Sequence, residues 1–178
     1  MVDEAYIDFY QQESCISLIG KYSNLVVLQT FSKAWGLAGI RLGVAFSSKE
    51  IIDLMNKVKP PYNVNQLTQQ VALEAFDRMD DFQKEIQIII EQRTWLSQEL
   101  EQFDFVEKIY PSDANFILVK TNAPNEIYDF LIQKNIIVRN RSTQLGCEGC
   151  LRLTIGTPEE NQRLVESLAI YETALTSS

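Results

Sequence analysis

Short runs of apolar, β-branched residues mark the first part of the chain. Residues 24–30 (Asn-Leu-Val-Val-Leu-Gln-Thr) and residues 42–46 (Leu-Gly-Val-Ala-Phe) have the length and composition that are typical of buried strands. Together with the helices that the pattern predicts after them, these runs indicate that residues 1–80 contain pieces of an α/β layer.

Two helices are predicted to follow these strands. Ser47, with Glu50 three residues later, has the spacing of a capping box, so a helix is expected to begin at Ser47. The Pro-Pro pair at residues 60–61 ends this helix, because proline lacks the backbone donor that a helix interior needs. A second helix is expected from about residue 66 to residue 79.

The longest periodic pattern comes next and predicts a long helix over residues 81–103. Apolar residues at spacings of three, four and seven form one face of this helix: Phe82, Ile86, Ile89, Leu96, Leu100 and Phe103. Core packing explains this pattern fully, so we assign it no chemistry.

Residues 104–178 show the shorter elements of a compact α+β domain. A helix is expected over residues 124–134, and Thr157 is expected to cap the last helix, with Pro158 at the first helical position and Glu160 at the third. Strands are expected at residues 115–119, 136–138 and 151–155. The chain is therefore predicted to be α/β, with a connecting helix between residues 1–80 and a small C-terminal domain.

Composition excludes several classes of protein. The 178 residues carry 16 basic and 24 acidic side chains, a net charge of −8, which gives no electrostatic footprint for nucleic acid or an anionic membrane. Histidine is absent, which excludes Ser-His-Asp catalysis and most zinc hydrolases. No apolar run approaches the ~20 residues of a membrane helix. Because histidine is absent, acid–base chemistry depends on lysine, tyrosine, cysteine or carboxylates.

The cysteines indicate a reducing compartment. Three cysteines, widely spread, do not make a disulfide framework, and the N-terminus lacks the apolar stretch of a signal peptide, so we expect a cytoplasmic protein. Cys147 and Cys150 match C-x-x-C, the spacing of a redox pair or of half a zinc site. Zinc would need two more ligands, and the pair lies in a turn before a strand rather than at a helix start. Two incidental cysteines are the favoured interpretation.

Lys33 follows the end of the strand at residues 24–30. Ligands bind at the carboxyl ends of strands in α/β sheets, and partial desolvation there frees a nucleophilic amine. Arg41, near the start of the next strand, and the hydroxyls of Thr30 and Ser32 would suit a bound phosphate. The segment lacks a G-x-x-x-x-G-K-[ST] loop, so it is not a nucleotide P-loop.

Asp3 and Tyr6 present a carboxylate and a phenol together. An Asp-Glu pair after a strand also resembles a Walker B motif, but no Walker A motif accompanies it. A carboxylate can keep a ring nitrogen protonated, and a phenol can hydrogen-bond an adjacent ring oxygen. With the Lys33 amine and the Arg41 guanidinium, these groups supply what pyridoxal phosphate needs.

The same residues carry a resemblance to a known family. Residues 3–6 (Asp-Glu-Ala-Tyr) and 30–43 (Thr-Phe-Ser-Lys-Ala-Trp-Gly-Leu-Ala-Gly-Ile-Arg-Leu-Gly) resemble the cofactor-binding half of fold-type I aminotransferases, which depend on pyridoxal 5'-phosphate. Four further motifs resemble those of the histidinol-phosphate aminotransferases, at residues 60–65, 113–116, 138–141 and 150–157. With them, the resemblance spans nearly the whole chain. It implies the C-terminal part of a PLP-dependent transferase fold, with residues 1–80 as a remnant of the PLP-binding large domain.

The resemblance implies a role for each candidate residue of the cofactor site. Lys33 would bind the cofactor covalently and move the proton between the substrate Cα and the cofactor. Asp3 would pair with the pyridine nitrogen, and Tyr6 with the phenolic oxygen. The cofactor phosphate would be held by Arg41 together with Ser32 or Thr30.

The resemblance also implies a substrate site. Arg139 and Arg152 would bind substrate anions, because a bidentate guanidinium suits both a carboxylate and a phosphate ester. Asn115 would line the pocket, whereas Arg141 is expected on the surface. The implied substrates are histidinol phosphate and glutamate or 2-oxoglutarate, in histidine biosynthesis, and a homodimer or other homo-oligomer is expected.

Members of this family are considerably longer than 178 residues, and Asp3 comes almost at the first residue. We therefore expect a C-terminal portion that does not catalyse transamination by itself, because groups that hold the cofactor are missing. Two alternatives stay open. One is another enzyme of the same fold, such as an aromatic aminotransferase or a threonine-phosphate decarboxylase, and the other is a non-enzymatic packing module.

Overall fold

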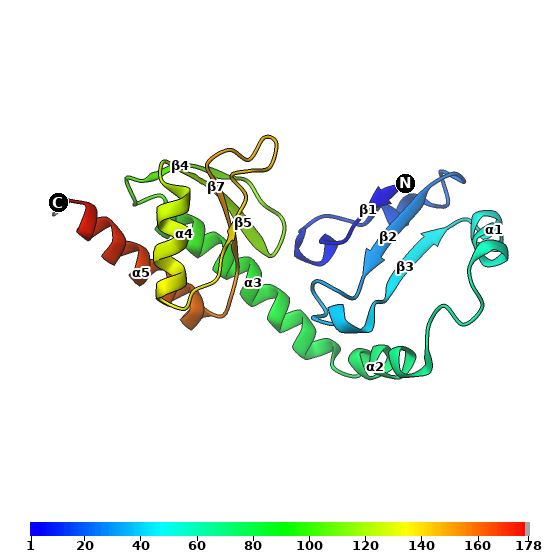
Figure 1. The fold of residues 1–178 in the computed structure, drawn as a ribbon. Helices are drawn as coiled ribbons and strands as arrows, with labels where there is room; N and C mark the ends of the chain where they lie inside the picture. Colours follow the sequence, from blue (N-terminus) through cyan, green and yellow to red (C-terminus); the bar gives the residue numbers. More distant parts are fainter. Residues whose placement is uncertain (177–178) are drawn as a thin grey trace. The chain divides into compact units, whose positions relative to one another are not determined.

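The computed structural model describes residues 1–176, which form two compact units (Figure 1). The units are Met1–Ile86 and Gln87–Ser178, and their boundary falls inside the long helix α3 (Met79–Leu100). Each unit has its own sheet and its own helices. Within residues 1–176, every helix is too short or too polar to cross a membrane.

The first unit is built on a three-stranded sheet with the order β1-β2-β3. β1 (Val2–Asp3) runs parallel to β2 (Val26–Thr30), and β2 pairs antiparallel with β3 (Gly43–Ser47). The two longer strands confirm the predicted apolar runs, with ends shifted by one or two residues. Two helices follow, α1 (Lys49–Val58) and α2 (Gln66–Phe76). Short 3₁₀ helices lie in the loops: Ile7–Phe9, Cys15–Leu18 and Ala38–Ile40.

The start of α1 differs from the prediction. Ser47 is the last residue of β3, and its hydroxyl donates to the carbonyl oxygen of Leu25 (2.5 Å). Ser48 is the N-cap of α1, but its side chain makes no capping hydrogen bond. The predicted capping box from Ser47 to Glu50 is wrong, because the Ser47 hydroxyl satisfies a backbone carbonyl next to the strand instead.

An aromatic cluster ties the segment after β2 to the helices of the first unit. Trp35 stacks on Phe82 at a centroid distance of 3.9 Å, and Phe76 meets Trp35 edge-on at 5.2 Å. Phe31 packs against both Trp35 and Phe76. Because Phe31 and Trp35 lie on either side of Lys33 in the sequence, these contacts hold the loop that carries Lys33.

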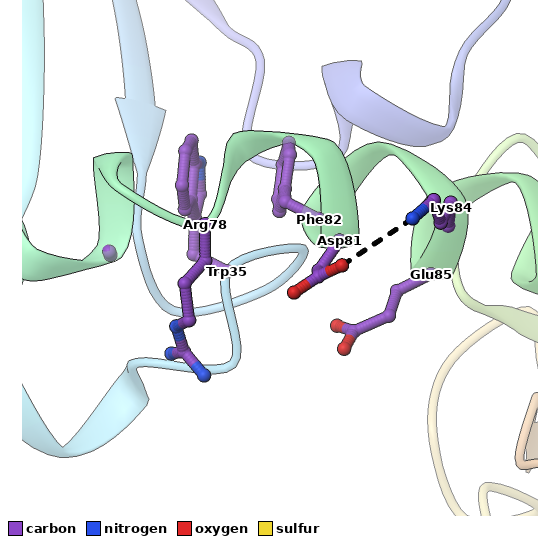
Figure 2. Close-up of a pocket in the computed structure, with 7 residues that line it drawn as sticks. Trp35, Arg78, Asp81, Phe82, Lys84 and Glu85 are labelled. Carbon is purple, nitrogen blue, oxygen red and sulfur yellow. Dashed lines mark ion pairs between the residues drawn. The ribbon is translucent and has the colours of Figure 1, made fainter.

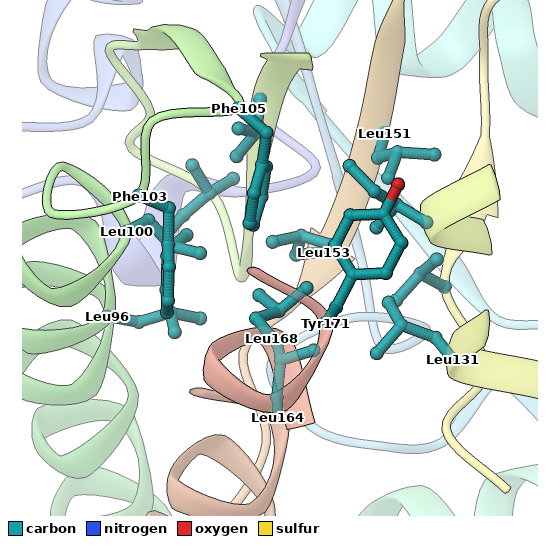
Figure 3. Packing of buried hydrophobic residues seen from close by; sticks show 14 of the residues in the cluster. Leu96, Leu100, Phe103, Phe105, Leu131, Leu151, Leu153, Leu164, Leu168 and Tyr171 are labelled. Carbon is teal, nitrogen blue, oxygen red and sulfur yellow. The ribbon is translucent and has the colours of Figure 1, made fainter. Parts of the chain in front are cut away.

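The second unit packs three helices against one face of an antiparallel four-stranded sheet with the order β4-β5-β7-β6. The helices are the C-terminal part of α3, α4 (Pro124–Gln133) and α5 (Pro158–Thr176). Figure 3 shows the core, where side chains of these helices meet the inward side chains of β5 and β7. The strands are β4 (Val106–Tyr110), β5 (Phe116–Thr121), β6 (Arg139–Asn140) and β7 (Cys150–Thr154).

Two sequence patterns of the second unit are confirmed in detail. The long helix predicted over residues 81–103 corresponds to α3, in which Leu96 and Leu100 are buried, although α3 ends at Leu100 and the buried Phe103 follows it. The capping box at the start of α5 also forms. The N–H of Glu160 donates to Thr157 Oγ1 (3.2 Å), and the N–H of Thr157 donates to Glu160 Oε2 (2.9 Å).

Two strands of this unit differ from the prediction. β4 was not predicted, and the strand expected at residues 136–138 begins only at Arg139. Asn135 adopts a left-handed conformation (φ 56°), and the N–H of Ile136 donates to the carbonyl oxygen of Leu131 (2.9 Å). Ile136 therefore closes the end of α4 rather than pairing in the sheet.

Candidate functional site

Three segments that carry candidate residues meet at one edge of the sheet in the first unit. Asp3 and Thr30 are the last residues of the parallel strands β1 and β2, so both strands end at this edge. β3 begins at the same edge, because Gly43 pairs with Thr30. Arg41 precedes that strand. The topology thus brings Asp3, Thr30 and Arg41 to one end of the sheet.

Thr30 is part of the turn that follows β2. Its Oγ1 accepts a hydrogen bond from the N–H of Ser32 (3.1 Å) and donates to the carbonyl oxygen of Leu42 (3.4 Å). The N–H of Phe31 donates to the same carbonyl oxygen (3.2 Å). The Thr30 side chain therefore holds the backbone of Ser32 at the sheet edge.

The ammonium group of Lys33 contacts Tyr6. The sequence predicted partial desolvation of Lys33, but its side chain is exposed, because Lys33 begins a surface turn that the N–H of Gly36 closes by donating to the Lys33 carbonyl oxygen (3.0 Å). The Nζ atom lies 5.1 Å from the centroid of the Tyr6 ring. A cation–π contact of this kind is worth about 0.5–1 kcal/mol at an exposed site. Since Tyr6 follows β1, the contact joins two loops at the same sheet edge.

Asp3 and Arg41 are exposed, and each is bonded within its own loop. Asp3 Oδ1 accepts from the N–H of Ala5 (3.0 Å). Arg41 has a positive φ of 55°, and its Nη1 donates to the carbonyl oxygen of Ala38 (2.8 Å). A left-handed conformation is uncommon for arginine, and strain of this kind gathers at functional sites. The guanidinium is held against its own turn.

In the second unit, Arg139 and Arg152 lie directly opposite each other on β6 and β7. Leu151 and Leu153 belong to the core, so strand alternation points Arg152 to the opposite face of the sheet. The guanidinium carbon of Arg152 lies 5.1 Å from the centroid of the Phe116 ring. Arg139 is exposed.

Two positive charges therefore share one rung of this ladder. Like charges on directly paired residues destabilise a sheet. In addition, the Nε atom of Arg152 is buried and has no hydrogen-bond partner among the described residues. An unpaired buried donor costs about 1–3 kcal/mol. A bound anion would relieve both penalties, which makes this pair a candidate anion site.

Asn115 and Arg141 lie beside these strands. Asn115 is half-buried just before β5, and its carbonyl oxygen accepts from the N–H of Ile155 (2.9 Å). Arg141, expected on the surface, is partly exposed, and its N–H donates to the carbonyl oxygen of Cys150 (2.8 Å), which extends the β6–β7 pairing. The substrate candidates thus lie in the second unit and the cofactor candidates in the first.

Glu4 belongs to the sheet edge of the first unit, although sequence reasoning gave it no role. Its side chain is buried (8% exposed), and its carboxylate accepts from the Ser14 hydroxyl (2.6 Å), the Cys15 N–H (2.7 Å) and the Gln29 amide (3.0 Å). Burial by itself would raise the pKa of this carboxyl group, but the hydrogen bonds outweigh burial and lower the pKa. The sequence signal for a buried Glu4 was its position directly after Asp3. Neighbouring residues along an extended strand face opposite sides of the sheet, so Glu4 faces away from the side that Asp3 faces.

The cavity in Figure 2 is lined by none of these candidates. Its volume is about 290 Å³, and it lies beside the stacked rings of Trp35 and Phe82. The ion pair between Lys84 and Asp81 (3.6 Å) borders it, and both side chains are largely exposed. Exposed pairs of this kind contribute little. The cavity is therefore a surface feature of the first unit.

The C-x-x-C segment forms a turn before β7. The N–H of Cys150 donates to the carbonyl oxygen of Cys147 (2.9 Å). Burial above all, and then the proximity of the Cys147 thiol, raise the pKa of the Cys150 thiol, which disfavours a reactive thiolate. No group of three or more metal-binding side chains occurs within residues 1–176.

Comparison with known proteins identifies similar enzymes. The family model described as aminotransferase class I and II matches residues 1–168. The chain is 53% identical over 170 residues to the histidinol-phosphate aminotransferase of Flavobacterium johnsoniae, a match that covers 96% of this chain and 49% of that relative. The chain spans about half the length of the curated relatives it matches.

Solved structures share the fold. The histidinol-phosphate aminotransferase from Clostridium acetobutylicum matches with a TM-score of 0.86 and 24% identity, over 97% of this chain and 53% of that chain. The histidinol-phosphate aminotransferase from Sinorhizobium meliloti, solved in complex with pyridoxal-5'-phosphate, matches with a TM-score of 0.81 and 22% identity, over 97% and 48%. These matches confirm the predicted α/β fold class.

Proposed function

Because the chain belongs to the class I and II aminotransferase family, we propose that it carries the cofactor and substrate residues of a histidinol-phosphate aminotransferase. This enzyme transfers an amino group between L-histidinol phosphate and 2-oxoglutarate. The observation that carries the proposal is the pairing of Arg139 with Arg152, whose buried Nε lacks a partner among the described residues. The 53% identity to a histidinol-phosphate aminotransferase supports it.

The groups at the sheet edge of the first unit fit pyridoxal phosphate. When bound, this cofactor supplies an electron sink for the negative charge that develops on the substrate Cα. Lys33 offers an exposed amine for covalent attachment, and the same amine moves a proton at the substrate Cα. Asp3 keeps the pyridine nitrogen protonated, and Tyr6 donates a hydrogen bond to the phenolic oxygen.

Two side chains at this edge bind the cofactor phosphate, and a third positions one of them. Arg41 exchanges its neutral partner, the carbonyl oxygen of Ala38, for the phosphate, because a charge-assisted hydrogen bond is stronger. Of the two hydroxyls, Ser32 is the better phosphate ligand, since Thr30 already donates to Leu42. Thr30 fixes the backbone N–H of Ser32.

The substrate anions bind on the open face of the sheet in the second unit. Arg139 and Arg152 each present parallel donors that suit the carboxylate of glutamate or 2-oxoglutarate and the phosphate of histidinol phosphate. The Phe116 ring supports the Arg152 guanidinium. Asn115 adds a neutral polar group next to β5.

We also propose that the protein is a homo-oligomer in a reducing, cytoplasmic compartment. Large apolar side chains on the helices of the first unit are exposed and need a cover: Leu54 (59%), Val58 (82%) and Leu67 (74%). The free cysteines Cys15, Cys147 and Cys150 are compatible with a reducing compartment.

A substrate comparison tests the proposed activity. The assay uses the full-length protein, by which we mean residues 1–178 together with any further residues of the natural polypeptide. It is assayed with histidinol phosphate, an aromatic amino acid and phosphothreonine, each with and without 2-oxoglutarate as the amino acceptor. We expect turnover to be fastest with histidinol phosphate and to require 2-oxoglutarate. Faster turnover of an aromatic amino acid, or decarboxylation of phosphothreonine, would assign the chain to another enzyme of the same fold. A protein that neither binds pyridoxal phosphate nor turns over any substrate would be a packing module.

A further inference from the structure

The Glu4 carboxylate joins the two ends of a loop at the cofactor edge of the first unit. The loop leaves the sheet after Glu4 and returns at Ser14 and Cys15, where the Ser14 hydroxyl and the Cys15 N–H donate to the two carboxylate oxygens of Glu4 (2.6 and 2.7 Å). A surface loop whose ends meet in this way is an Ω-type loop. We call residues 5–14 the neck-closed loop.

The same carboxylate fastens the neck to the sheet. The side-chain amide of Gln29 donates to Glu4 Oε2 (3.0 Å), and the N–H of Glu4 donates to the carbonyl oxygen of Leu28 (2.8 Å). Gln29 directly precedes Thr30, the last residue of β2. Glu4 therefore links the neck-closed loop to both parallel strands at the edge where the cofactor candidates lie.

The neck-closed loop carries Tyr6, whose ring contacts the Lys33 ammonium at 5.1 Å. The loop is also anchored to the first unit, because Phe9 is fully buried (0% exposed). The N–H of Phe9 donates to the carbonyl oxygen of Tyr6 (3.0 Å). A loop that is tied at its neck and anchored by a buried phenylalanine has little conformational freedom, so the Tyr6 ring stays where Lys33 reaches it.

We propose that Glu4 is a positioning residue, whose carboxylate closes the neck of this loop and so holds Tyr6 against Lys33. The proposal rests on the proposed function, in which Lys33 binds pyridoxal phosphate and Tyr6 donates to the phenolic oxygen of the cofactor. A hydrogen bond to that oxygen changes the proton affinity of the group that Lys33 and the cofactor form together. Glu4 thus acts through Tyr6 on a property that light absorption reports.

The carboxylate is suited to this place because every group around it is a donor. A glutamine side chain would turn its NH₂ group either toward the Ser14 hydroxyl and the Gln29 amide or toward the N–H of Cys15, and in both orientations at least one donor would lose its partner. Glu4→Gln is therefore expected to open the neck while it keeps the size of the side chain.

The test compares Glu4→Gln with Glu13→Gln in the full-length protein. Glu13 lies in the neck-closed loop and is exposed. Glu13→Gln therefore removes one negative charge, as Glu4→Gln does, but leaves the neck intact. The first measurement needs no cofactor and is the hydrogen exchange of peptides that cover residues 5–15. We expect exchange to become about tenfold faster in Glu4→Gln, as loss of a buried hydrogen bond implies, and to stay unchanged in Glu13→Gln.

The second measurement is the pH midpoint of the absorption band that pyridoxal phosphate forms at Lys33. We expect Glu4→Gln to shift this midpoint in the same direction as Tyr6→Phe, and Glu13→Gln to leave it in place. Faster exchange with an unmoved midpoint would make Glu4 merely structural and overturn the proposal. Unchanged exchange in Glu4→Gln would show that Glu4 does not hold the two ends of the loop together, and it would also overturn the proposal.

Failure of the proposed function can be distinguished from failure of the positioning role by the same two measurements. If the wild-type protein forms no band at Lys33, the proposed function is wrong and the positioning role falls with it, although the exchange data still report on the neck. If Glu4→Gln does not fold, Ser14→Ala replaces it, because this variant removes one donor and no charge. We expect Ser14→Ala to give smaller changes in the same directions, and no change in either measurement would overturn the proposal.

Discussion

Arg139 on β6 lies directly opposite Arg152 on β7, so two guanidinium groups share one rung of the sheet in the second unit. Cross-strand pairs of like charge are unfavourable, and the buried Nε of Arg152 adds a second cost. Under the proposed function, a carboxylate or phosphate bound between the two side chains would remove both costs. The proposal therefore connects the local energetics of β6 and β7 to substrate binding.

Arg152→Ala in the full-length protein should lower kcat/KM strongly and leave cofactor binding intact. Loss of a charge-assisted hydrogen bond from a buried anion site costs about 2–5 kcal/mol. Steady-state kinetics and the cofactor absorption band measure the two effects separately. Lys108→Ala is the control, because Lys108 is an exposed cation on β4 of the same unit. Loss of the absorption band in Arg152→Ala would contradict the assignment of this arginine to the substrate.

Thr157→Ala should destabilise the protein by about 0.5–2 kcal/mol, because it removes half of a reciprocal capping box. Ser48→Ala is the matched control, since Ser48 is also an N-cap but makes no capping hydrogen bond. Urea unfolding of both variants measures the difference. Equal losses would mean that the capping box at α5 contributes no more than the helix start at α1.

Gly149→Ala should cost more stability than Gly146→Ala. Both glycines have a φ of 77°, so alanine at either position pays the left-handed penalty of about 1–2 kcal/mol. A Cβ at Gly149 would lie 3.1 Å from the backbone carbonyl oxygen of Thr121, whereas a Cβ at Gly146 would meet nothing within 4 Å. Thermal unfolding should show a larger loss for Gly149→Ala, and equal losses would remove the steric argument.

The stability contribution of Glu4 should depend on pH. Its pKa is lowered in the folded protein, so folding favours the charged form. This contribution is present above the ordinary pKa of about 4.3 and is lost as the pH falls through the lower, folded value. Wild type should therefore be more stable than Glu4→Gln near neutral pH, and the gap should shrink below about pH 4. Urea unfolding at several pH values measures this gap, and a constant gap would contradict a charged Glu4.

The fold was predictable where one element has a strong pattern of its own. The apolar face with Leu96 and Leu100 predicted α3, and Thr157 with Glu160 predicted the start of α5. Predictions failed where a partner far along the chain decided the outcome. Ser47 bonds to Leu25 rather than capping a helix, and β4 is an edge strand whose polar residues hide its alternation.

The sequence indicated which residue types could form the candidate site, but it did not show their geometry. Residue types at Lys33 and Tyr6 suggested a cofactor, while their contact depends on how two loops fold at one sheet edge. Glu4 was overlooked because its partners Ser14 and Gln29 become neighbours only in the fold. The left-handed turn at Arg41 has no sequence signal, because most residues with a positive φ are glycine or asparagine.

Under the proposed function, Lys33 is the residue to which pyridoxal phosphate attaches. The direct test is borohydride reduction of the full-length protein with the cofactor, followed by peptide mapping of the labelled lysine. Lys21, an exposed lysine in the same unit, serves as the internal control. We expect one cofactor group per chain on the Lys33 peptide and none after Lys33→Ala. Label on Lys21 or another lysine, with Lys33 unmodified, would contradict it.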